Sequence, residues 1–117
     1  MTELIACASN EKGALKHVQN VVEREEWSNI IIITSQEFDN KQFSKKTELI
    51  KIDLNKTLQE LIEELTKTFK NKIKDTEVGL NLICGTGKEH MAILSALLKS
   101  GLGIRLVALT KEGRKEV

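Results

Sequence analysis

Four consecutive isoleucines, Ile30 to Ile33, constrain the fold of this chain more than any other feature. Branching at Cβ favours extended backbone, so the run predicts a strand over residues 29–34. A strand that carries no polar alternation must be buried on both faces, as happens in a parallel sheet covered by helices on each side. The run therefore predicts an α/β protein.

The chain has 117 residues, which we expect to form one domain, 1–117. The same reasoning assigns the other strands and helices. Apolar runs predict further strands at 4–8, 48–54, 78–84 and 103–110. Apolar residues at helical spacing predict helices at 12–26, 58–70 and 89–99. Residues 35–46 are expected to form a long connection or a short, poorly defined helix, and residues 111–117 a charged tail.

Strands separated by helices pair in parallel through right-handed crossovers. The chain is therefore expected to form a three-layer Rossmann-like sandwich with a mostly parallel five-stranded sheet in the order 3-2-1-4-5. Ligands in such sheets bind beyond the carboxyl ends of the strands, where the strand order reverses. This places the loop at 8–13 opposite the loop at 85–90 across one crevice.

The turn Gly85-Thr86-Gly87-Lys88 joins the fourth strand to the third helix. Glycines let the backbone approach a ligand closely, and the helix that follows directs unpaired N–H groups and its positive dipole end at the turn. With the charge of Lys88, these features predict an anion site, most simply for phosphate. The alternative is a tight turn with an exposed lysine, in which Glu89 occupies the positive helix end itself.

This turn matches neither common phosphate motif. A Walker P-loop requires glycine where Leu82 stands and serine or threonine where Glu89 stands. The dinucleotide fingerprint follows a first strand and requires a third glycine.

Small polar residues follow the first strand. Ser9 or Asn10 is expected to cap the first helix, and a capping residue can also contact a ligand. Lys12 is either a second cation for that ligand or a solvated side chain.

Two histidines and two cysteines are the remaining reactive side chains. His90 is a candidate general acid or base beside Lys88, or else a capping or surface residue. His17 is expected to be peripheral. Cys7 and Cys84 form either a thiol pair beneath the crevice or two buried small hydrophobes.

Composition excludes several functions. A net charge of +1 and 3% aromatic residues argue against binding of a nucleic-acid duplex or of single strands by base stacking. No apolar run reaches the ~18 residues that a membrane span needs, and the first residues do not resemble a signal peptide. A cytoplasmic protein with no cofactor and no metal site is expected.

The third helix is apolar on nearly every side. Such a helix is covered either by a partner as well as by its own sheet, or by the sheet and the C-terminal tail. The first alternative predicts a homodimer.

Three successive elements of the chain resemble the CRISPR-associated Rossmann-fold (CARF) domain. They are a strand, a Gly-Thr-Gly-Lys turn and a helix rich in Met, Ala and Leu. In that family the turn commonly reads Gly-Gly-Thr-Lys with a methionine shortly behind. Residues 85–88 exchange the middle two positions, and Met91 comes one position late. Ser9 and Asn10 match the small polar residues that the family places opposite the lysine.

The resemblance implies a homodimer that binds a cyclic oligoadenylate, with Ser9, Asn10, Thr86 and Lys88 lining the pocket. Some members also cleave this ligand by positioning its 2′-hydroxyl for in-line attack.

The sequence as a whole leaves three hypotheses for the function. The first is nucleotide binding at Ser9, Asn10 and residues 85–89. The second is a ring-nuclease-like phosphodiesterase assisted by Lys88 or His90, and the third is an interaction subunit without a small ligand.

Overall fold

The computed structural model describes residues 2–38 and 42–117. In chain order its elements are β1 (Glu3–Cys7), α1 (Lys12–Glu23), β2 (Asn29–Ser35), β3 (Glu48–Ile52), α2 (Leu58–Lys72), β4 (Glu77–Asn81), α3 (Gly87–Lys99), β5 (Gly103–Thr110) and β6 (Gly113–Glu116). Residues 39–41 of the predicted connection 35–46 lie outside the described residues.

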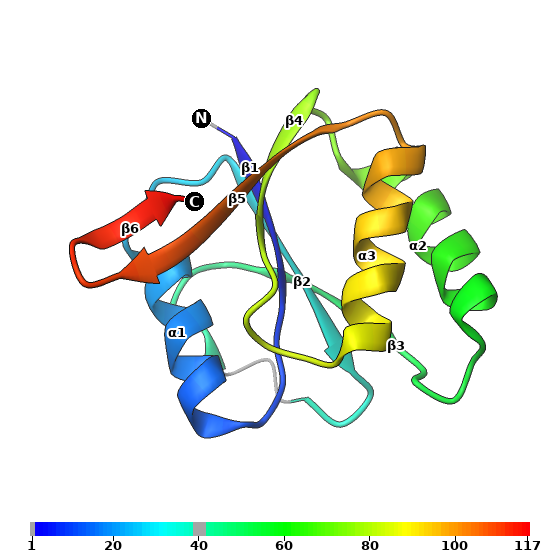
Figure 1. Ribbon diagram of the computed structural model, residues 1–117, viewed down its shortest axis with the longest axis horizontal. Helices are drawn as coiled ribbons and strands as arrows, with labels where there is room; N and C mark the ends of the chain where they lie inside the picture. The colour runs from blue at the N-terminus through cyan, green and yellow to red at the C-terminus, as the bar shows by residue number, and fades with distance from the viewer. Residues whose placement is uncertain (1, 39–41) are drawn as a thin grey trace.

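The strands form one sheet in the order β3-β2-β1-β4-β5-β6, and the first five strands run parallel (Figure 1). This confirms the predicted α/β fold and the order 3-2-1-4-5. The order reverses between β1 and β4, which pair in parallel from Glu3 opposite Val78 to Ala6 opposite Asn81. The carboxyl ends of these two strands therefore lie side by side, at the predicted switch point.

The sheet has six strands, so the predicted count of five and the predicted charged tail at 111–117 are wrong. β6 turns back at Gly113 and pairs antiparallel with β5, from Thr110 opposite Gly113 to Val107 opposite Glu116. Ion pairs from Arg105 to Glu116 and from Arg114 to Glu25 connect this charged strand to its surroundings. A strand this polar is held by pairing at the sheet edge and not by burial.

Helices cover both faces of the sheet (Figure 1). Ile31 and Ile33 pack into the core that contains the buried residues of α2 and α3. Ile30 and Ile32 pack into the second core, against α1. The isoleucine run is thus buried on both faces, as its composition predicts.

Several element boundaries differ from the predicted ones. β4 ends at Asn81, so Cys84 lies in the following loop and not in the strand. α1 ends at Glu23, and α3 begins at Gly87, two residues earlier than predicted. The cap of α1 is Glu11, so the prediction of Ser9 or Asn10 as that cap is wrong.

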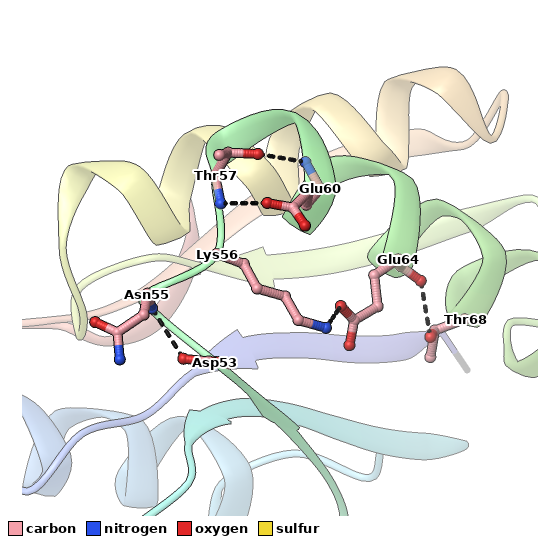
Figure 2. A network of polar contacts seen from close by, with 7 residues as sticks. All are labelled: Asp53, Asn55, Lys56, Thr57, Glu60, Glu64 and Thr68. Carbon is pink, nitrogen blue, oxygen red and sulfur yellow. Dashed lines mark hydrogen bonds and ion pairs between the residues drawn. The ribbon is translucent and has the colours of Figure 1, made fainter.

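Thr57 caps the start of α2 in a capping box (Figure 2). Thr57 Oγ1 accepts from Glu60 N at 3.2 Å, and Glu60 Oε1 accepts from Thr57 N at 3.0 Å. Just before the helix, the Asp53 carboxylate accepts from Asn55 N at 2.9 Å, and Lys56 pairs with Glu64 at 2.8 Å. These contacts fix the β3–α2 loop, which lies next to the candidate site.

No helix in the described ranges has the length and apolar character that crossing a membrane requires.

Candidate functional site

The loops after β1 and β4 border a cavity of about 340 Å³ at the switch point. Four of the predicted site residues line it: Ser9, Gly85, Thr86 and Glu89. Three others, Asn10, Gly87 and Lys88, do not. The remaining lining residues are Ala8, Glu11, Ala14, Ser35, Leu54 and Ile83. Two loops that are distant in the sequence therefore meet at one crevice.

The N-terminus of α3 carries its own carboxylate. Thr86 Oγ1 accepts from Glu89 N at 3.4 Å, and Glu89 Oε2 accepts from Thr86 N at 3.4 Å. This capping box satisfies two of the N–H groups at the helix start. The alternative that the sequence left open for Glu89 is thus the one that the structure adopts.

A buried contact joins the end of β1 to the same carboxylate. Cys7 Sγ donates to Glu89 Oε2 at 2.9 Å, and Glu89 is 7% exposed. Burial raises the pKa of the Cys7 thiol, and its hydrogen bond to Glu89 raises it further. Cys7 therefore remains a neutral thiol that donates a hydrogen bond, and it is a poor nucleophile.

Gly85 makes this contact possible. Its φ is +96°, in the region that favours glycine. A Cβ at this position would overlap the Glu89 carboxylate and lie 2.5 Å from Cys7 Sγ. The turn therefore needs glycine here to let the backbone pass over the Cys7–Glu89 pair.

The facing helix is capped in a similar way. Glu11 accepts from Gly13 N at 3.2 Å and from Ala14 N at 2.9 Å. Ser9 Oγ accepts from Glu11 N at 3.4 Å and donates to Cys84 Sγ at 3.7 Å. The two helix ends that face the crevice thus each hold a glutamate, which complements the positive helix dipole.

Lys88 does not line the crevice. Its ammonium donates to the carbonyl oxygen of Leu54 at 2.9 Å and to that of Lys56 at 2.5 Å. The side chain thus connects the start of α3 to the β3–α2 loop.

His90 and Cys84 are both engaged within the β4–α3 loop region. A ring nitrogen of His90, Nε2, lies 2.6 Å from the carbonyl oxygen of Cys84. Cys84 and Cys7 are both free and buried. Packing and loop support account for these contacts, and a catalytic role for His90 or Lys88 stays a prediction.

His17 does not line the cavity, but its ring contacts elements that lie next to it. Its Nε2 lies 3.1 Å from Asn81 Nδ2 and accepts from Leu109 N at 3.4 Å. Asn81 also donates to Val107 O at 2.9 Å and accepts from Ile83 N at 3.4 Å. His17 therefore joins α1 to β5 and, through Asn81, to the loop that borders the crevice. Burial lowers the pKa of His17.

Some of the unpredicted contacts had a signal in the sequence. Thr86-Gly-Lys-Glu89 has the spacing of a capping box, which indicates that Glu89 reaches back to its own helix start. The hydrogen bond of Cys7 to Glu89 and the cap at Glu11 had no comparable signal, because they depend on how β1 and α3 meet.

Comparison with known proteins gives no further constraint: no family model, no curated protein and no solved structure matches this chain. Within residues 2–38 and 42–117, His, Cys, Asp and Glu side chains form no group of three or more that could hold a metal ion.

Substitution of Gly85 by alanine should destabilise the protein by at least about 1–2 kcal/mol, because the positive φ and the contact with Cys7 and Glu89 both disfavour a Cβ. Urea denaturation measures the free energy of unfolding. Gly87→Ala is the matched control, since a Cβ there meets no atom within 4 Å. Equal stabilities for the two variants would contradict this account of the turn.

The lowered pKa of His17 predicts a pH dependence of stability. The native state favours the neutral ring, so the unfolded chain binds more protons once the pH falls below the ordinary value of 6.5. The free energy of unfolding should decrease from there down to the lowered pKa, and level off below it. Urea denaturation between about pH 7.5 and about pH 5.5 measures this effect.

His17→Gln should remove that part of the pH dependence, whereas His90→Gln should keep it. An unchanged pH dependence in His17→Gln would show that the ring does not need to be neutral in the native state.

Proposed function

We propose that the protein binds a nucleotide-type anion at the crevice between the loops after β1 and β4. The observation that carries this proposal is the cavity of about 340 Å³ at the point where the sheet order reverses. Its size lies within the range of small-molecule sites, about 300–1,000 Å³, and its position is where α/β sheets bind ligands. The resemblance to CARF domains gives cyclic oligoadenylate as the ligand to test.

The exposed start of α3 is the place for the phosphate. No described residue accepts from the N–H groups of Gly87 and Lys88, and both residues are exposed. These groups lie at the positive end of the helix, where anions bind. Glu89 occupies the inner side of the same helix end, which leaves the outer side for phosphate.

Lys88 supplies the cation in this proposal. Its ammonium lies on two backbone carbonyls at the rim and makes no ion pair among the described residues. A lysine ammonium carries three donors, so it can donate to a phosphate oxygen as a third partner while it keeps both carbonyls.

The exposed face of α3 supports a homodimer. Met91 is 59% exposed and Leu98 is 62% exposed. Together with Leu94, Ser95 and Lys99 they border a shallow hollow on the helix. Exposed apolar patches of this kind are typical of protein–protein contacts, and in this proposal a second copy covers the patch.

Lys88→Ala should weaken nucleotide binding more than tenfold, which corresponds to about 1.4 kcal/mol, without unfolding the protein. Isothermal titration calorimetry with cyclic tetra-adenylate measures the affinity, and thermal denaturation checks the fold. Lys70→Ala, on the exposed side of α2, is the control and should bind as the parent does. Equal affinity of Lys88→Ala and parent would remove Lys88 from the proposal.

Leu98→Glu should convert the dimer to a monomer, because a charge placed in a buried apolar contact carries a large desolvation cost. Light scattering gives the mass in solution. Leu58→Glu, on α2, is the control, since Leu58 is partly exposed away from this helix face. A parent protein that is already monomeric, or a Leu98→Glu dimer, would contradict the α3 interface.

A further inference from the structure

The inner wall of the crevice is rich in hydrogen-bond acceptors. Two glutamates, Glu11 and Glu89, line the cavity, and none of the described residues that line it is Lys, Arg or His. Lys88, which precedes Glu89 in the sequence, donates to the carbonyls of Leu54 and Lys56. A phosphate inside the cavity would therefore face two carboxylates, which electrostatics disfavours.

Glu89 has one oxygen available for a ligand. Its Oε2 accepts from Cys7 Sγ and from Thr86 N. Among the residues that the structure describes, none donates a hydrogen bond to its Oε1. The side chain is more than nine-tenths buried and lines the cavity. A carboxylate oxygen in such a place is stabilised by any group that donates to it.

The contacts of Glu89 also fix its position. Cys7 and Thr86 hold Oε2 from two directions, and the carboxylate lies in the space that a Cβ on Gly85 would occupy. Glu11, in contrast, uses both oxygens to cap α1. Of the two carboxylates, Glu89 is the one that is preorganised to receive a donor.

Apolar and hydroxyl groups complete the cavity. Ala8, Ala14, Leu54 and Ile83 provide apolar surface, and Ile83 is 54% exposed. This surface suits a flat, largely apolar ring system with a polar edge.

We infer that the crevice receives the amino-bearing edge of a nucleobase, whose exocyclic amine donates a hydrogen bond to Glu89 Oε1. The inference rests on the proposed nucleotide binding and reverses the simplest orientation: the base enters the crevice, and the phosphate lies outside at the N–H groups of Gly87 and Lys88. An exocyclic amine on a nucleobase donates and does not accept, and one of its two N–H groups suffices for the one available oxygen. Glu89 is then the residue that sets base specificity.

The test compares two ligands on the unaltered protein by isothermal titration calorimetry: adenosine 5′-monophosphate and purine riboside 5′-monophosphate. They differ only in the 6-amino group, which purine riboside replaces by hydrogen. Adenosine monophosphate should bind more than tenfold tighter, because its analogue leaves the buried carboxylate without a donor.

Glu89→Gln should abolish this preference. The amide oxygen takes the place of Oε2, where Cys7 and Thr86 donate, so the amide NH₂ faces the crevice and opposes the amine. Glu63→Gln, on the exposed side of α2, is the matched control and should retain the preference.

The outcomes are distinguishable. A tenfold preference that Glu89→Gln loses and Glu63→Gln keeps supports the inference. Equal affinity of the two ligands for the parent protein overturns it and leaves nucleotide binding in place. Failure of the parent to bind either of these ligands or cyclic tetra-adenylate overturns both the inference and the proposed function.

Discussion

The parallel pairing of β1 with β4 is the constraint on which the rest of the structure depends. It joins segments about 75 residues apart, Glu3 with Val78 and Ala6 with Asn81, and makes them neighbours at the centre of the sheet. The contacts that join the two loops follow from it: Cys7 reaches Glu89, and Ser9 reaches Cys84. Without this pairing the two loops would lie on separate edges.

Two electrostatic effects oppose each other at the crevice: the helix ends attract anions, and carboxylates of the protein already occupy those ends. Helix N-termini attract negative charge, and here the protein supplies that charge itself through Glu11 and Glu89. Self-capping stabilises the helices, but it makes the inner wall unsuitable for phosphate. The N–H groups of Gly87 and Lys88, outside this wall, are the part of the helix end that remains for an anion. This division is the physical reason to place the base and the phosphate of a nucleotide on different sides of the α3 start.

Most of the fold could be predicted from patterns that are local in the sequence. The isoleucine run and the helical spacing of apolar residues suffice for a parallel sheet covered by helices, and the order 3-2-1-4-5 was the expected one among the few that right-handed crossovers allow. β6 could not be predicted in this way, since Gly113–Glu116 contains no apolar residue and is held by pairing and ion pairs. At the site, the meeting of the two loops was predictable, whereas the direction of Lys88 depends on the position of the β3–α2 loop. Burial of Glu89 depends on Cys7, 82 residues away.

We propose that the two loops at the β1–β4 switch point form one binding site. A titration of ¹⁵N-labelled protein with adenosine 5′-monophosphate, followed by NMR of the backbone amides, tests this proposal. The largest chemical-shift changes should fall together on Ser9 to Glu11 and on Gly85 to Glu89. Shifts confined to the opposite end of the sheet, around the hollow that Trp27 and Lys46 border, would contradict it.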